Sequence, residues 1–329
     1  MSKYFIVGGA GGIGSYFIDV LLKDSNTELI TIYDNFSSGR EWHYEHNLHD
    51  KRLHVIRGSV ENNVTLTSTM KNHDVVIHLA SNPDISKAVT QPDIDFWQGT
   101  ALTNYVLEAM RKNGIKRILY ASGSGVYGDI GLEDATESRG NLMPISTYGA
   151  SKLAGETLIN SYCHMFDMTG IAFRFANVLT PYSTHGVTLD FIKKLLSNQK
   201  ELTILGDGSQ SKSYIHVNDV VNAVLLANKK LSIHSHYYCN TKPFEVYNVA
   251  TNDRITVTEI AELVAETLNI NDVKFNYTGG DRGWKGDVTI VVLNTEKIKA
   301  LGWFSKNTTK EAIKLSILEM LPNIKLNKM

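Results

Sequence analysis

A glycine-rich turn near the start of the chain places the strongest constraint on its fold. The apolar run at 4–7 is typical of a buried parallel strand, and a helical pattern of apolar residues follows from Tyr16 to Leu22. Between them, glycines at positions 8, 9, 11, 12 and 14 satisfy both Gly-x-x-Gly-x-x-Gly and Gly-x-Gly-x-x-Gly. Residues without a Cβ let backbone N–H groups and a helix N-terminus approach a pyrophosphate. The segment therefore predicts the phosphate-binding turn of a dinucleotide site.

An acidic residue at the end of the next apolar run bears on the choice of dinucleotide. The run at 29–33 ends in Asp34, twenty residues after Gly14. A carboxylate at this place accepts hydrogen bonds from an adenosine ribose and repels a 2′-phosphate. Asp34 therefore favours NAD over NADP, although Arg40 lies close enough in sequence to leave NADP open.

Apolar runs and helical patterns continue to alternate along the first half of the chain. We expect further strands at 53–57, 74–80 and 117–122, and a helix over 96–112. Such alternation predicts an α/β fold with a Rossmann-type doubly wound parallel sheet, whose ligands bind at the carboxyl ends of the strands. After residue 177 the pattern changes, and helices are expected at 189–196 and 310–321.

These patterns divide the chain in two. Residues 1–178 are expected to form an NAD-binding Rossmann domain, to which 214–250 returns. Residues 179–329 are expected to form mainly a smaller, mixed α/β domain that binds the substrate.

Tyr148 and Lys152 stand four residues apart on an expected helix for which Ser146 or Thr147 is the candidate N-cap. A phenol has a pKa of about 10, and a nearby ammonium group favours its ionised form. Such a tyrosine can take a proton from an alcohol while hydride leaves the same carbon. An exposed helical pair is the alternative interpretation, because this spacing is common. A dinucleotide site in the same chain favours catalysis.

Composition excludes several other classes. The 329 residues carry 33 basic and 34 acidic side chains, so no basic excess points to nucleic acid. No apolar run reaches the length of a membrane span, and a strand begins too early for a signal peptide, so we expect no membrane partner and a cytoplasmic location. Cys163 and Cys239 fit neither a disulfide framework nor a zinc site, and both are expected to be buried. His185 has no partner at ligand spacing, so no metal is expected.

Taken together, the motifs resemble the extended short-chain dehydrogenase/reductase family, in its NAD-dependent nucleotide-sugar epimerase/dehydratase branch, and are closest to the UDP-glucose 4-epimerase-like members. The resemblance covers nearly the whole chain, with the motifs in the family's order. It is carried by Gly8-x-x-Gly11-x-x-Gly14, 34–39, 78–80, 126–128, Tyr148-x-x-x-Lys152, 174–177, 205–208, 213–219, 247–249 and 301–303.

The resemblance implies a bound NAD that is reduced and reoxidised within one catalytic cycle. Tyr148 would be the base, and Lys152 would hold the nicotinamide ribose. The residues implied to line the cofactor are Gly8, Gly11, Gly12, Ile13, Gly14, Asp34, Asn35, Ser38, Ser59, Val60, Leu79, Ala80, Ser81, Tyr148, Lys152 and Phe175.

The resemblance implies a nucleoside-diphosphate sugar as substrate. Its diphosphate needs cations and amide donors, and its base and ribose need a slot with an apolar wall. The candidate residues are Asn177, His185, Val187, Lys212, Tyr214, Arg282 and Asp287, with Lys285 as an alternative to Arg282. Relatives commonly form homodimers by packing the Tyr-x-x-x-Lys helix and the helix before it into a four-helix bundle.

The chain departs from the family pattern at several places. Where relatives usually have Ser or Thr to bond the reacting hydroxyl, this chain has Gly123, flanked by Ser122 and Ser124 as candidate replacements. The Asp-Glu pair of 4,6-dehydratases is Ser124-Gly125 here, so dehydration is not expected. Ser59 and Phe96 replace the family's usual Asp and Asn.

The expected function is oxidation at C4 of a nucleoside-diphosphate sugar, as a 4-epimerase with tightly bound NAD. Gly123 leaves open a 4-dehydrogenase that releases the 4-keto sugar. A catalytically silent dinucleotide-binding protein is the third alternative, and the presence of both Tyr148 and Lys152 argues against it.

Overall fold

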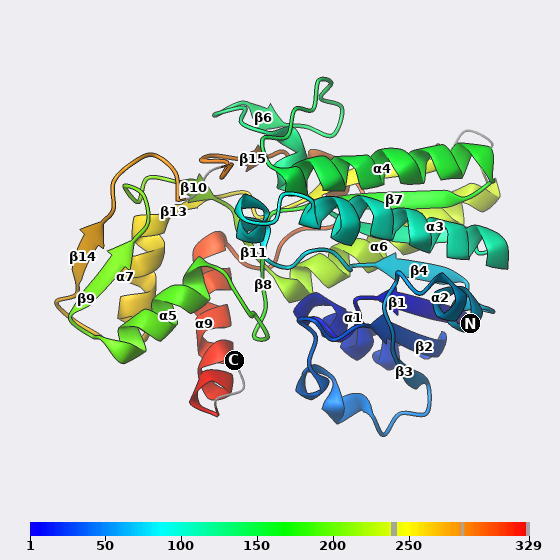
Figure 1. Cartoon of the computed structure of the whole chain (residues 1–329), viewed down its shortest axis with the longest axis horizontal. Coiled ribbons are helices and arrows are strands. Elements are labelled where there is room, and N and C mark those ends of the chain that lie inside the picture. Colours follow the sequence, from blue (N-terminus) through cyan, green and yellow to red (C-terminus); the bar gives the residue numbers. More distant parts are fainter. Residues whose placement is uncertain (238–241, 284–285, 327–329) are drawn as a thin grey trace.

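The computed structural model describes residues 1–237, 242–283 and 286–326, of which 232–237 are described in backbone only. Cys239 and Lys285 lie outside these ranges. The central element is a seven-stranded sheet with the order β12-β7-β5-β4-β1-β2-β3, in which every neighbouring pair is parallel (Figure 1). Its strands are β1 (Ser2–Val7), β2 (Thr27–Asp34), β3 (Leu53–Arg57), β4 (Val75–His78), β5 (Arg117–Gly123), β7 (Thr169–Phe175) and β12 (Phe244–Val249). The Rossmann-type sheet predicted from the sequence is confirmed.

Helices cover both faces of the sheet. One face carries α1 (Gly12–Lys23) and α6 (Val217–Tyr237), whose apolar side chains share a core with the strands. The other face carries α2 (Asn63–Met70), α3 (Leu102–Asn113) and α4 (Thr147–Met165). Cys163 of α4 is buried in this second core, as predicted. Continuous apolar strands such as β1 are the expected consequence of a sheet buried on both faces.

The strand order reverses between β1 and β4, and this point positions the site. From β1 the chain runs to β2 and β3 on one side, and from β4 to β5, β7 and β12 on the other. Ligands of doubly wound sheets bind at the carboxyl ends of the strands on either side of such a switch point. The glycine turn follows β1, and residues 79–81 follow β4, so both lie at this point.

The helix expected over 96–112 has two parts. Phe96–Ala101 is a π-helix (η4), and the α-helix α3 begins only at Leu102. The π-helix lies close against α4, since a Cβ added to Gly99 would meet the Ser151 Oγ. Single π turns inside helices often occur at functional sites.

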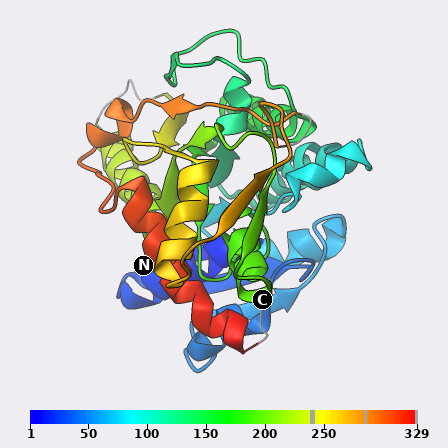
Figure 2. The same cartoon turned by 90° about the vertical axis from the view of Figure 1, so that its left-hand side faces the viewer.

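The smaller part of the molecule is built around a separate apolar core. Its main helices are α5 (Val187–Ser197), α7 (Val257–Thr267) and α9 (Thr309–Lys325), of which α7 and α9 lie side by side (Figure 2). Strands β9 (Glu201–Ile204) and β14 (Lys274–Tyr277) pair in parallel. The remaining short strands pair as β10 (Ser211–Lys212) with β13 (Ile255–Thr256), β11 (Tyr214–His216) with β8 (Asn177–Leu179), and β15 (Val292–Leu293) with β6 (Asp134–Ala135). The other short helices are η1 (Glu41–His43), η2 (Glu45–Asn47), η3 (Ile85–Val89), η5 (Ser124–Tyr127) and α8 (Glu296–Lys299).

The chain crosses between the two parts more than once. After α5 and β9 it returns to the large sheet through α6 and β12, and β12 pairs with β7. The division at 1–178, 214–250 and 179–329 stays a prediction. Among the described residues, no helix combines the length and apolar character needed to cross a bilayer.

Candidate active site

A single large cavity of about 1270 Å³ runs along the carboxyl ends of the strands and into the smaller part of the molecule. Its wall contains every residue predicted for catalysis and cofactor binding, and all but one of those predicted for the substrate. The predicted residues on the wall are Gly8, Gly11, Gly12, Ile13, Gly14, Asp34, Asn35, Ser38, Ser59, Val60, Leu79, Ala80, Ser81, Ser122, Ser124, Tyr148, Lys152, Phe175, Asn177, His185, Val187, Lys212, Tyr214 and Asp287. The structure therefore brings them together, although their individual roles stay predictions.

The glycine turn has the shape that a pyrophosphate requires. Gly8 has a φ of +80°, and a Cβ added there would lie 2.8 Å from the Ala80 nitrogen. A Cβ added to Gly14 would lie 2.5 Å from the Gly9 carbonyl oxygen. Helix α1 begins at Gly12, behind an N-cap glycine without a side-chain cap, so N–H groups of its first turn remain available to an anion.

Asp34 ends β2 on the same wall. Its Oδ2 accepts a hydrogen bond from the Ala10 N–H (3.0 Å), and its Oδ1 accepts one from the Phe36 N–H (2.7 Å). Burial raises the pKa of Asp34, against the lowering effect of these bonds and of Arg57. The Arg40 guanidinium donates to the Gly39 carbonyl (2.8 Å), and Arg40 is not among the residues that line the cavity. Together, the glycine turn and Asp34 fit NAD.

Substituting alanine for Gly8 should disable this turn. A side chain at φ +80° is strained, and its Cβ would collide with backbone that cannot give way. We expect Gly8→Ala to lose more than about 1 kcal/mol of unfolding free energy and most of its bound NAD. Gly140→Ala is the matched control, since that Cβ would meet nothing within 4 Å. Thermal denaturation and the NAD content of purified protein measure both effects, and a Gly8→Ala protein that purifies with full NAD would contradict the assignment.

Helix α4 presents the expected catalytic pair. The Ser146 side chain caps the helix by accepting from the Gly149 N–H (3.1 Å), as predicted. Lys152 is buried, and its Nζ donates to the Ala121 carbonyl (2.8 Å). Burial lowers the pKa of Lys152 to about 8, against the raising effect of Asp95 and Glu156. Its Nζ lies 5.4 Å from the centre of the Tyr148 ring.

Burial acts on the pKa of Tyr148 in the direction opposite to the lowering predicted from Lys152, and it is the largest effect. Burial raises the pKa of Tyr148 to about 12, a hydrogen bond with Ser81 lowers it, and the Asp95 charge raises it. The loss of water around the phenol raises its pKa more than the hydrogen bond with Ser81 lowers it, because desolvation penalises the charged form. Lys152 directs its Nζ to a backbone carbonyl instead.

Ser122 is not available as the substitute for the missing hydroxyl at position 123. Its Oγ donates to the Glu156 Oε1 at 2.6 Å, and both side chains are buried. Ser124 begins η5 on the cavity wall and remains a candidate. Gly123 itself faces the reactive tyrosine, since a Cβ added there would have the Tyr148 Cε1, at 4.0 Å, as its nearest contact.

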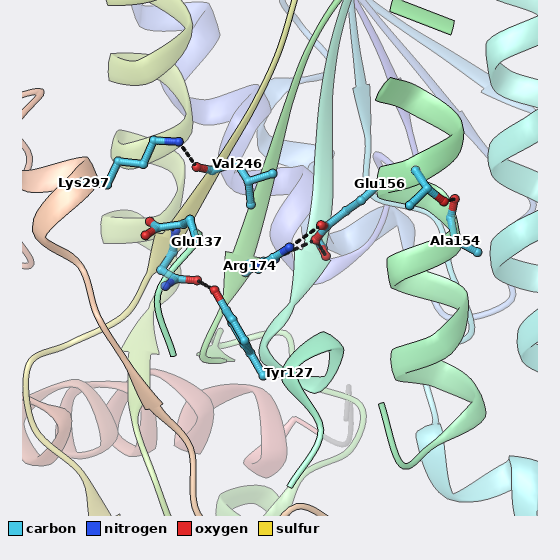
Figure 3. Close-up of polar contacts among 10 residues, drawn as sticks. Tyr127, Glu137, Ala154, Glu156, Arg174, Val246 and Lys297 are labelled. Carbon is cyan, nitrogen blue, oxygen red and sulfur yellow. Dashed lines mark hydrogen bonds and ion pairs between the residues drawn. The ribbon is translucent and has the colours of Figure 1, made fainter. Parts of the chain in front are cut away.

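A buried ion pair contacts Ser122, a residue of the cavity wall. Arg174 of β7 donates from Nε and Nη2 to the two carboxylate oxygens of Glu156, at 3.0 and 2.7 Å (Figure 3). Both side chains are only 4% exposed. The Arg174 guanidinium also lies 4.7 Å from the centre of the Tyr127 ring, and the Tyr127 hydroxyl donates to Asn248. With the hydrogen bond from Ser122 to Glu156, the pair connects strand β5, helix α4 and strand β7.

On the substrate side, the predicted cations are paired with carboxylates. Lys212 forms an ion pair with Asp287 on the cavity wall. Arg282 is the one predicted residue that the structure does not place on the wall, because its guanidinium is held by the Asp129 carboxylate and the Asp287 carbonyl, each at 2.6 Å. Lys285, the alternative, lies outside the described residues.

Two buried polar residues next to the site, Asn82 and Asp95, could not be found from the sequence. Asp95, which precedes η4, accepts from the Asn82 side chain at 2.9 Å and from the Thr147 hydroxyl at 2.7 Å. Asn82 and Asp95 are almost completely buried. These residues belong to no motif, and they are distant from one another in sequence.

Comparison with known proteins agrees with the predicted fold and family. Residues 4–250 match the family described as the NAD dependent epimerase/dehydratase family. A putative UDP-glucose 4-epimerase of Methanocaldococcus jannaschii is 30% identical over 94% of this chain and 95% of its own. A crystal structure of a UDP-galactose 4-epimerase is 33% identical, with a TM-score of 0.85 over 98% of this chain and 99% of its own. A dTDP-glucose 4,6-dehydratase of Streptomyces venezuelae, at 20% identity, shares the fold with a TM-score of 0.88 over 98% of each chain.

The fold and the cavity define an NAD-dependent enzyme of the extended short-chain dehydrogenase/reductase class. Within that class, the chain belongs to the NAD-dependent epimerase/dehydratase family.

Proposed function

We propose that this enzyme is a 4-epimerase of a nucleoside-diphosphate sugar and that it keeps its NAD bound through the cycle. The observation that carries the proposal is the single cavity that joins the glycine turn, the Tyr148–Lys152 pair and the Lys212–Asp287 pair. The epimerase names of two relatives at 30% and 33% identity support the same reaction.

The roles of the side chains follow from their placement. Tyr148 would take the proton of the sugar C4 hydroxyl and later return it, while buried Lys152 holds positive charge beside it. When bound, NAD would supply the hydride acceptor for oxidation at C4 and the hydride donor for reduction of the ketone from its opposite face. Asn177, His185, Val187, Tyr214 and the Lys212–Asp287 pair would hold the nucleotide and sugar.

Dehydration is disfavoured by the residues that follow β5. Ser124 and Gly125, at the place of the dehydratases' acidic pair, both line the cavity, and neither can protonate a leaving hydroxyl as a carboxylic acid does. A 4-dehydrogenase is the second candidate function. Gly123 has no hydroxyl to bond the sugar, and weaker binding of the keto sugar favours its release.

A time course followed by nuclear magnetic resonance separates these functions. Purified enzyme would be incubated with UDP-, GDP-, CDP- and dTDP-sugars, chosen by their effect on the melting temperature. Epimerisation gives the C4-inverted sugar without net use of oxidant. Accumulating ketone would instead establish the dehydrogenase, and no change in any sugar would favour a silent dinucleotide-binding protein.

We also propose a homodimer formed through α3 and α4, which lie side by side on one face of the sheet. Exposed apolar side chains at Trp97 and Met165, before α3 and at the end of α4, support this surface. Sedimentation equilibrium should give twice the chain mass, and a monomer would contradict the proposal. The cytoplasmic location and the role in carbohydrate biosynthesis stay predictions.

A further inference from the structure

Relatives usually have a Ser or Thr hydroxyl at the position of Gly123. In this chain a candidate replacement lies in the loop after strand β4. Resting on the 4-epimerase function above, we propose that Ser81 donates a hydrogen bond to the reactive phenol of Tyr148 in this enzyme, and that a bridge through Asp95 holds the two residues together.

The space beside Tyr148 is open on the side of β5. Gly123 is extended, with φ −156° and ψ 163°, so any residue could adopt this conformation. A Cβ added there would meet only the Tyr148 ring, at 4.0 Å. The neighbouring Ser122 hydroxyl is occupied by Glu156. Strand β5 therefore has no side chain at position 123 to offer Tyr148, although the backbone would accept one.

Ser81 approaches from β4. The N–H groups of Leu79 and Ala80 both donate to the Val7 carbonyl, at 2.9 and 3.1 Å, and fix the chain as it leaves the strand. Ser81 follows, half-buried, on the wall of the cavity that Tyr148 also lines. A hydrogen bond from Ser81 acts to lower the pKa of Tyr148, because a donor stabilises the phenolate.

The Asp95 bridge connects the residues next to these two. One oxygen of the Asp95 carboxylate accepts from Asn82, directly after Ser81, and the other accepts from Thr147, directly before Tyr148. Asp95 is 1% exposed and Asn82 is 3% exposed, so water competes little for the bond between them. A single buried carboxylate thus sets the position of the β4 loop relative to the start of α4. Asp95 is a positioning residue in this arrangement.

The charge around Tyr148 fixes the sign of the expected effect. The groups that face the phenol are Lys152 on its own helix, Asp95 before η4 and Tyr120 on β5. Removing the Ser81 hydroxyl leaves these groups in place and takes away a stabilising donor. The pKa of Tyr148 should then rise, and the pH at which the rate of sugar oxidation rises should move upward.

The test uses the NAD-loaded enzyme and the sugar identified by the time course. In Ser81→Ala we expect kcat to fall about ten- to hundredfold, the effect of a lost hydrogen bond to a charged group. The rising limb of the pH profile should move up by about one pH unit. KM and melting temperature should change little. Adding Gly123→Ser to Ser81→Ala should raise kcat again by at least tenfold, because the new hydroxyl would enter the open space beside Tyr148. Ser68→Ala, an exposed serine on α2, is the matched control.

The outcomes separate this inference from the proposed function. An enzyme that epimerises the sugar and depends on Tyr148, but keeps kcat within twofold and an unmoved pH profile in Ser81→Ala, would overturn the Ser81 assignment alone. A double variant that regains nothing would also count against it. Sugar turnover that persists in Tyr148→Phe would instead overturn the proposed function.

Asp95 is tested without removing its charge. Thr147→Val keeps the shape of the side chain and deletes the donor to Asp95. It should shift the pH profile in the same direction as Ser81→Ala, by a smaller amount. An unmoved profile would show that the bridge does not position the pair.

Discussion

Tyr148→Phe should lower the rate of sugar turnover by about 10³-fold, because it removes the proton acceptor and almost nothing else. The phenyl ring keeps its contact with Lys152, and the residues of the glycine turn are untouched. NAD content and the rise in melting temperature with a nucleotide sugar should therefore stay close to those of the natural protein.

Two readouts make this expectation specific. Incubation of the natural enzyme with its sugar should produce absorbance near the NADH band, and Tyr148→Phe should abolish it. Tyr162→Phe is the matched control, since Tyr162 lies on the same helix and donates its hydroxyl to Glu108 at 2.8 Å. A Tyr148→Phe enzyme that retains more than a tenth of the activity would exclude the phenol as the base.

Glu156→Ala should cost about 3–5 kcal/mol of unfolding free energy, the largest stability effect that we expect from one substitution at the site. It leaves the Arg174 charge buried without its partner and removes the acceptor of Ser122. Urea denaturation measures the loss, provided that the slope of the transition is unchanged.

Two further variants test the reason for that loss. Glu266→Ala breaks the exposed pair with Lys314 and should cost less than about 1 kcal/mol. Replacing Glu156 and Arg174 together by Leu and Met should restore much of the stability, since an apolar pair leaves no buried charge. A single Glu156→Ala variant within 1 kcal/mol of the natural protein would show that Arg174 finds water or another acceptor.

Much of the fold could be predicted because its signals are local. A parallel sheet covered on both faces requires continuous apolar strands, and β1 and β2 show them directly. The glycine turn was equally clear, because a positive φ and a close backbone approach at Gly8 leave no choice of residue. The N-cap at Ser146 follows from the same kind of local rule.

Features that depend on distant residues could not be predicted. Ser122 was a reasonable candidate for the catalytic hydroxyl, but it donates its hydrogen bond to Glu156, 34 positions away. The Asp95 bridge joins three segments that only the fold brings together. The direction of the pKa shift at Tyr148 depends on how far burial outweighs nearby partners, and sequence spacing does not report burial.

A crystal structure of the enzyme with NAD and a nucleotide sugar would test the central claim most directly. The account predicts that the Tyr148 hydroxyl lies within about 3 Å of the sugar O4, on the same side as the reactive carbon of the nicotinamide. A complex in which that hydroxyl faces away from both, with no conformer that brings it back, would contradict the assignment of the reaction to this site.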